Sequence, residues 1–128
     1  MNNDAKRDEE TKLTMDLAKS FMREMFDAEP DWKKAYFRFV MQKFGPGCNA
    51  SYVVGSKVEF LDMRRHSNFI DEMMENASRL AEVMGKEKMV MLLAINSDYN
   101  FRFFYEYENM EKWKITKLDG KTGIPEGF

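Results

Sequence analysis

Two side chains in this sequence could take part in nucleophilic or acid–base chemistry: Cys48 and His66, the only cysteine and the only histidine. The imidazole of His66, which follows a pair of arginines, could exchange a proton near neutral pH. Cys48 lies in a stretch rich in glycine and proline, and it could act as a nucleophile if its pKa were lowered. The sequence leaves a Cys48–His66 dyad open, but neither residue lies in a recognisable catalytic signature and the spacing indicates no further partner. We therefore expect that the protein is not an enzyme.

Metal and phosphate sites have even less support from the spacing of residues. One histidine, one cysteine and scattered carboxylates do not reproduce the ligand spacing of a zinc or calcium site. The segment Gly45-Pro46-Gly47 lacks the Gly-Lys-Ser/Thr of a phosphate loop and precedes a predicted strand, whereas a phosphate loop opens a helix. We expect no metal, no cofactor and no small-molecule substrate.

Composition limits the classes of partner. The chain has 128 residues and a formal net charge of -2, whereas domains that bind nucleic acid usually show a clear basic excess. No apolar run approaches the ~18 residues that a membrane span needs, and the N-terminus does not resemble a signal peptide. A single cysteine excludes an intramolecular disulfide. We expect a cytoplasmic protein with neither a nucleic-acid nor a membrane partner.

Hydrophobic periodicity predicts two helices. Apolar residues recur at intervals of three and four over residues 11–26, which is typical of an amphipathic helix, and Pro30 makes its continuation unfavourable. The second helix has Ser67 as a suitable N-cap and Gly85 at its C-terminal end. Residues 1–10 are polar and without periodicity. We expect them to form a flexible segment that precedes a single domain of residues 11–128.

Alternating patterns and turn residues predict the strands. Residues 32–44 alternate with a period of two, which is typical of a half-buried strand. Residues 45–49 form a cluster of turn-forming residues, and Gly55-Ser56 suits a tight primed turn between two short strands. The predicted strands are 32–44, 51–54, 57–61, 89–95 and 101–108, with 113–118 as an optional last strand and 120–128 as loop.

This order of elements predicts an α+β fold. We expect an antiparallel sheet of about five to six strands with the two main helices packed on one face. The opposite face of the sheet is then expected to be partly open to solvent or to a partner. Twelve methionines and eleven phenylalanines indicate a soft, aromatic core. An alternative interpretation is that the protein is a small-ligand-binding or regulatory module, in which these methionine and phenylalanine side chains line a pocket.

The strand 101–108 carries the first candidate binding surface. Its odd-numbered residues, from Phe101 to Tyr107, are aromatic and suit a core, whereas its even-numbered residues combine one ring with charges. With the preceding turn, these form a candidate partner-binding surface, here called the hairpin surface, in which Phe104 is the expected anchor. The alternative is that Phe104 lies under Trp113 or another part of the C-terminal tail. The hairpin surface consists of Asp98, Tyr99, Arg102, Phe104, Glu106 and Glu108.

The second candidate surface is the exposed side of the second helix. Its outward positions are rich in carboxylates, and Asp71, Glu72 and Glu75 are here called the acidic helix face. Either acidic run alone is usually a solvated surface, but the two together favour a basic protein partner. Complementary charge speeds the encounter, and a central aromatic residue supplies much of the binding energy.

Three segments of the chain resemble the YezG-like immunity proteins. These are the aromatic strand opening with Trp32 (residues 32–39), the long second helix ending near Gly85, and the aromatic strand that runs into Tyr-Glu-Asn (residues 103–109). The likeness covers residues 13–109. Proteins of this kind, like the broader group of contact-dependent growth inhibition immunity proteins, are small cytosolic α+β proteins. The resemblance implies that the chain binds a cognate bacterial toxin domain, often a nuclease, stoichiometrically and without an active site of its own.

Overall fold

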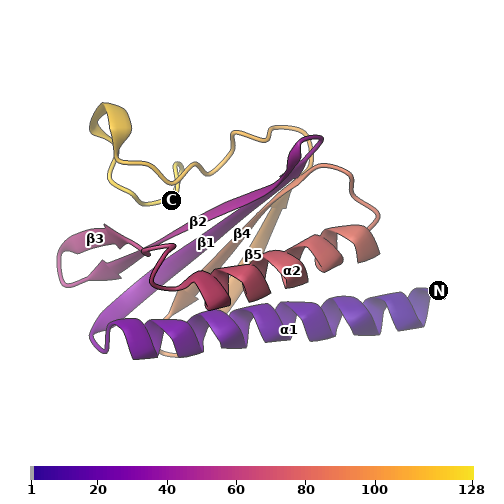
Figure 1. The fold of residues 1–128 in the computed structure, drawn as a ribbon, viewed down its shortest axis with the longest axis horizontal. Coiled ribbons are helices and arrows are strands. Elements are labelled where there is room, and N and C mark those ends of the chain that lie inside the picture. Colours follow the sequence, from indigo (N-terminus) through magenta and orange to yellow (C-terminus); the bar gives the residue numbers. More distant parts are fainter. Residues whose placement is uncertain (1) are drawn as a thin grey trace.

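The computed structural model describes residues 2–128. Five strands form one antiparallel sheet in the order β3-β2-β1-β4-β5, and two helices pack against one of its faces (Figure 1). The predicted α+β fold with both helices on one face is confirmed. The elements are α1 (Asn3–Ala28), β1 (Trp32–Gln42), β2 (Gly45–Val54), β3 (Lys57–Phe60), α2 (Ser67–Val83), β4 (Met89–Asn96), β5 (Phe101–Glu106) and a short 3-10 turn (Leu118–Gly120).

The first helix begins at Asn3, so the start predicted near residue 11 is wrong and residues 3–10 are helical. Two contacts explain this longer helix. The side chain of Asn2 accepts a hydrogen bond from the backbone N–H of Ala5 at 2.8 Å, which caps the first turn. Two turns later, Glu9 bonds the Arg79 guanidinium of α2 at 2.7 Å. Periodicity alone did not indicate helix here because these turns are held at their cap and by a polar contact, and they bury no apolar stripe.

The second helix is confirmed, with one change at its start. It begins at Ser67 itself, and His66 occupies the N-cap position without a side-chain hydrogen bond to the helix, so the predicted N-cap is displaced by one residue. The C-terminal end agrees with the prediction. Gly85 has φ +71°, its N–H bonds the Glu82 carbonyl at 3.0 Å, and the next N–H bonds the Ala81 carbonyl at 2.9 Å. This paired arrangement is a Schellman motif, which glycine favours.

The first hairpin turns earlier than predicted. Residues 45–49, predicted as a turn, belong to β2, and the chain reverses at Lys43-Phe44, where Gln42 pairs with Gly45. A proline is tolerated in this part of β2 because β3 pairs only with residues 51–54 and leaves the other side of Pro46 without a strand. The predicted tight turn at Gly55-Ser56 is confirmed, with Gly55 at φ +59°.

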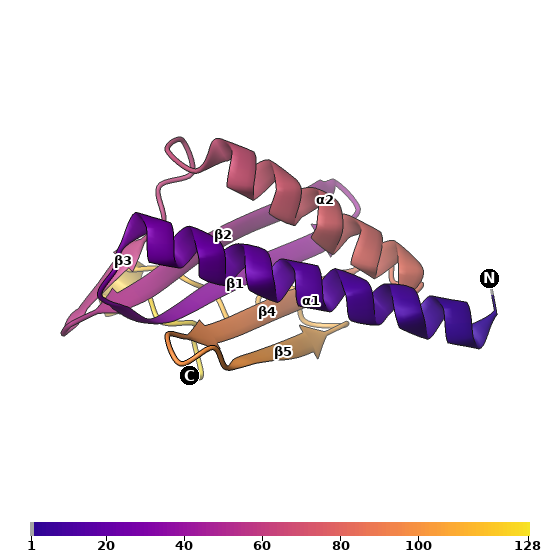
Figure 2. The same ribbon diagram turned by 90° about the horizontal axis from the view of Figure 1, so that it is seen from below.

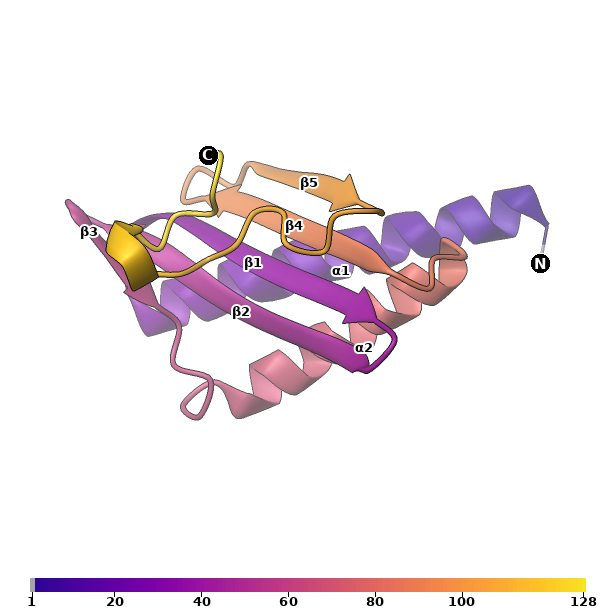
Figure 3. The same ribbon diagram turned by 90° about the horizontal axis from the view of Figure 1, so that it is seen from above.

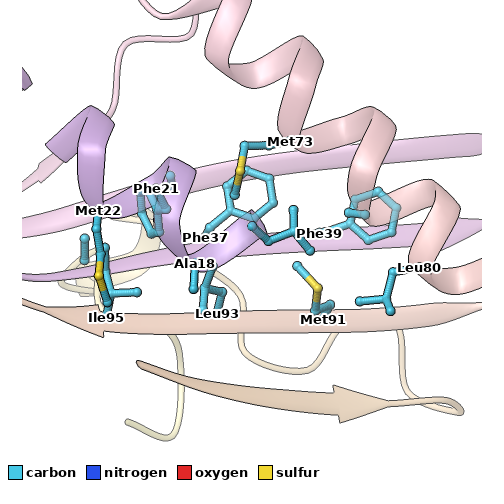
Figure 4. Close-up of a cluster of buried hydrophobic side chains, with 14 of the residues drawn as sticks. Ala18, Phe21, Met22, Phe37, Phe39, Met73, Leu80, Met91, Leu93 and Ile95 are labelled. Carbon is cyan, nitrogen blue, oxygen red and sulfur yellow. The ribbon is translucent and has the colours of Figure 1, made fainter. Parts of the chain in front are cut away.

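The main core lies between the helices and the sheet (Figure 4). Phe21 of α1 packs edge-on against Phe37 of β1, with ring centroids 6.0 Å apart. The buried methionines fill space around these rings, which agrees with the prediction of a soft core. The fully buried methionines of this cluster are Met25, Met73, Met89 and Met91.

The C-terminal tail covers the other face of the sheet (Figure 3). The predicted last strand at 113–118 is wrong: this segment has no strand structure, and Trp113 has φ +60°. Ile115 packs instead with Tyr36 and Leu92 on the outer face of the sheet. For this reason β1 is buried on both faces, with Tyr36 and Arg38 only 8% and 9% exposed, and the prediction of a half-buried strand is also wrong.

Candidate protein-binding surface

Cys48 and His66, the two side chains that could take part in nucleophilic or acid–base chemistry, have separate surroundings. Cys48 lies on β2 opposite Phe39 and packs against the main core, and burial raises the pKa of its thiol to about 11. The Nδ1 atom of His66 lies 3.7 Å from a carboxylate oxygen of Glu24 on α1. The structure of residues 2–128 shows no hydrogen bond between Cys48 and His66. A thiol with a raised pKa is a poor nucleophile at neutral pH.

Replacing Cys48 or His66 with alanine should therefore leave the biological activity of the protein intact. The measurement is growth protection in the assay described under Proposed function, with circular dichroism to verify the fold of each variant. Loss of protection by a folded variant would favour an enzyme with these two residues in its site.

Metal ligands do not cluster in the part of the chain that the structure describes. No group of three or more histidine, cysteine, aspartate or glutamate side chains there is arranged to hold a metal ion. Neither described helix is both long and apolar enough to cross a membrane. Two hollows on residues 2–128, of about 1520 and 840 Å³, are open surface grooves, not enclosed cavities.

Polar side chains on the outer face of the sheet hold the tail in place. Arg38 of β1 donates hydrogen bonds to the carbonyl oxygens of Lys112 and Met110, at 2.9 and 2.7 Å. Asn49 and Ser51 of β2 donate to the carbonyl oxygens of residues 115 and 123, at 2.9 and 2.7 Å. Burial lowers the pKa of Arg38, and the nearby charges of Glu111 and Glu126 oppose that effect. The tail therefore obtains from side chains the bonds that a strand would obtain from a ladder.

Replacing Arg38 with methionine should destabilise the protein by about 1.5–3 kcal/mol, because it removes hydrogen bonds from a charged donor to two carbonyl groups. Amide hydrogen exchange should accelerate mainly in residues 110–128. Lys34→Met is a matched control, since Lys34 is an exposed cation on the same face of β1. Unchanged exchange in the tail of the Arg38 variant would contradict this role.

Phe104, the expected anchor of the hairpin surface, lies beneath the tail. Its ring contacts Phe128 edge-on, with centroids 5.0 Å apart, and Trp113, with centroids 6.0 Å apart. The arrangement is the alternative that the sequence left open, in which the tail covers this ring. Phe104 is nevertheless only half-buried, and the Arg102 guanidinium lies 5.6 Å from its ring centroid. Its role in binding stays a prediction.

The charged members of the hairpin surface are only partly free. The Glu106 carboxylate accepts hydrogen bonds from the backbone N–H groups of Glu108 and Asn109, at 3.1 and 3.2 Å, and it pairs with Lys112. These bonds lower the pKa of Glu106. Its charge therefore serves the turn after β5, whereas Glu108 and Asp98 are exposed.

Tyr99 belongs to an aromatic group at the turn between β4 and β5. It is 71% exposed, but its ring stacks on Phe26 of α1 with centroids 5.5 Å apart. The residue has φ +66°, a conformation that the tight turn imposes on it. Tyr99 and Asp98 therefore remain accessible at one end of the hairpin surface.

The acidic helix face is exposed and lies apart from the hairpin surface. Asp71, Glu72 and Glu75 form no ion pair with any residue from 2 to 128, although Ser20 donates a hydrogen bond to Glu72 at 3.4 Å. Figure 2 shows α1 between α2 and β5, so α1 separates the acidic helix face from the hairpin surface. If both surfaces bind, they contact either two different partners or one partner large enough to reach around α1; otherwise only one of the two surfaces binds.

Phe44, an exposed ring that the sequence pattern did not single out, lines the same groove as Glu75 of the acidic helix face. It occupies the turn between β1 and β2 and is 94% exposed. Together with Glu75 and Arg79 of α2 it lines an open groove of about 1520 Å³. A signal was present in the sequence: a large apolar residue beside Gly45-Pro46-Gly47 suits a hairpin turn, where its side chain is difficult to bury.

Comparisons with known proteins do not assign the chain to a family. No protein-family model matches the sequence, and no curated protein matches it.

Proposed function

We propose that this protein is an immunity protein that binds and neutralises a bacterial toxin domain stoichiometrically, and that the toxin is a nuclease with a basic surface. The observation that carries the proposal is the acidic helix face, whose three exposed carboxylates form no ion pair within residues 2–128, and whose member Glu75 lines a groove together with the exposed ring of Phe44. The resemblance to YezG-like immunity proteins points to the same class of partner.

Charge explains how the acidic helix face would recognise a nuclease. A nuclease presents lysine and arginine side chains to the phosphates of its substrate. Carboxylates on a rigid helix carry negative charge, as the phosphates do, and hold it at fixed positions. They would therefore attract the toxin and compete with the nucleic acid for its basic surface. Arg79, the one cation of α2, already bonds Glu9 and Glu82 at 2.7 and 3.0 Å, so its charge is largely neutralised.

Phe44 supplies the apolar part of such an interface. Binding energy concentrates in a few aromatic residues that become fully desolvated, with charged residues around them. At 94% exposure, this ring has almost its whole surface available for burial by a partner. The short hairpin turn fixes the backbone of Phe44, so little conformational freedom is lost on binding.

The experiment starts from the neighbouring gene. If it encodes a large secreted protein with a variable C-terminal domain, that domain is expressed from an inducible promoter in bacteria with and without this chain. We expect growth arrest without the chain, normal growth with it, and a one-to-one complex on copurification.

A charge-reversed variant tests whether the acidic helix face is the binding surface. Asp71→Lys, Glu72→Lys and Glu75→Lys combined should abolish protection while the protein stays folded, because all three side chains are exposed. Growth arrest that the wild-type chain does not relieve, with no copurification, would contradict the proposal.

A further inference from the structure

The two edge strands of the sheet differ in how well they are protected against pairing with another strand. β3, at one edge, has only four residues, and two of them are the exposed charges Lys57 and Glu59. β5, at the other edge, has six residues, four of them aromatic, and contains no lysine or proline. Short length, lysine and proline are among the usual devices that keep an edge strand from pairing. β5 has none of them.

The outward-facing backbone groups of β5 follow from the register with β4. The N–H of Asn96 donates to the carbonyl oxygen of Asn100 at 3.0 Å, and these residues lie directly opposite each other in the hairpin. Along an antiparallel pair, residues whose backbone groups point to the partner strand alternate with residues whose backbone groups point away from it. Even-numbered residues of β5 therefore direct their N–H and C=O groups to β4. Phe101, Phe103 and Tyr105 direct theirs away from the sheet, where the structure of residues 2–128 places no further strand.

We propose that two copies of this chain pair through their β5 edges, antiparallel, around a two-fold axis at Phe104. In this arrangement Phe103 of each copy lies opposite Tyr105 of the other and exchanges both backbone hydrogen bonds with it. The two Phe104 rings face each other on the axis. Arg102 of each copy lies opposite Glu106 of the other, which creates two ion pairs by symmetry.

The pattern of side chains selects this register over its neighbours. A two-fold axis perpendicular to the sheet keeps helix-side residues opposite helix-side residues, so the register can change only in steps that move the axis by one residue. An axis at Phe103 would place Arg102 opposite Phe104. An axis at Tyr105 would place Phe104 opposite Glu106. Only the axis at Phe104 pairs opposite charges with each other and rings with rings over residues 102–106.

The surroundings of β5 leave room for such pairing. Figure 2 shows α1 over the inner strands of the sheet, with β5 beyond it at the edge. On the opposite face the tail leaves Phe104 half-buried and Arg102 exposed. The proposal does not depend on toxin binding, because the acidic helix face and Phe44 lie on other elements.

Sedimentation equilibrium of the purified full chain over a range of concentrations tests the pairing. We expect a reversible dimer for the wild type. Arg102→Glu, which places like charges opposite each other twice per dimer, should weaken it at least about tenfold. Lys57→Glu, a charge reversal at the other edge, should not change it. A wild-type chain that stays monomeric throughout, or a dimer that Arg102→Glu does not weaken, would overturn the proposal.

Mixing two charge-reversed variants gives a stricter test. Arg102→Glu alone and Glu106→Arg alone should each be mainly monomeric, whereas their mixture should form a heterodimer, because each strand then faces the opposite charge. Circular dichroism verifies the fold of Glu106→Arg, since that change also removes the turn bonds of Glu106. Folded variants that fail to associate when mixed would exclude this register.

Cysteine cross-linking reads the register independently of charge. In a Cys48→Ala background, Phe104→Cys places two thiols opposite each other in a pair with close side chains, which suits a disulfide. We expect rapid oxidation of this variant to a covalent dimer and slow oxidation of Phe103→Cys. Faster cross-linking of Phe103→Cys would overturn the axis at Phe104.

Discussion

Replacing Leu80 with alanine should destabilise the fold by about 2–5 kcal/mol, since it removes buried methyl groups and leaves a cavity. Leu80 is 1% exposed and reaches from α2 into the main core (Figure 4). Helices and sheet hold this core from both sides, so the site has little freedom to collapse. The measurement is urea unfolding, in which the midpoint should fall while the slope stays the same.

Glu75 provides the control for Leu80. It lies on the same helix but points to solvent, so Glu75→Ala should change the free energy of unfolding by less than about 0.5 kcal/mol. Equal losses for Leu80→Ala and Glu75→Ala would contradict the buried face of α2 that the structure shows. The contrast also matters for binding experiments, because it shows that the acidic helix face can be altered without loss of the fold.

Replacing Phe44 with alanine should weaken binding of the cognate toxin domain at least about thirtyfold, since truncation of a central aromatic residue typically costs 2 kcal/mol or more. Folding stability should change little, because the ring is 94% exposed in the free protein. Charge reversal of Asp71, Glu72 and Glu75 should act differently. It should slow association most strongly at low ionic strength, where surface charges are least screened.

Phe60 is the matched control for Phe44. It is also an exposed phenylalanine, at 44%, but it lies on β3, away from the groove. Phe60→Ala should leave the affinity for the toxin domain unchanged in titration calorimetry. If Phe44→Ala binds as tightly as the wild type and a Phe104→Ala variant with an intact fold does not, the hairpin surface is the binding site.

Elements with a strong local signal were predictable from sequence. The apolar stripe of the second helix, the glycine after its end and the Gly55-Ser56 turn all depend on residues within a few positions of one another. The sequence also separates the aromatic residues of β5 correctly: Phe103 and Tyr105 pack against the helix-side core, and Phe104 lies on the other face. A period of two suffices for that separation, because it is a property of every strand.

Tertiary structure alone decided what covers each face. The tail packs over the outer side of the sheet because Arg38, Asn49 and Ser51 bond its carbonyl groups, and these partners are more than sixty residues apart in the chain. The same long-range contacts buried the outer face of β1 and half-covered Phe104.

Pairing across the sheet overrode local turn propensity as well. Residues 45–49 extend as a strand because β1 offers them a ladder, which moves the turn to Lys43-Phe44 and exposes the ring on which the proposed interface depends. Local sequence determined the second helix, its glycine end, the Gly55-Ser56 turn and how each strand's side chains divide between its two faces. Contacts between distant segments decided which of those faces remain available to a partner, because exposure depends on every element packed nearby.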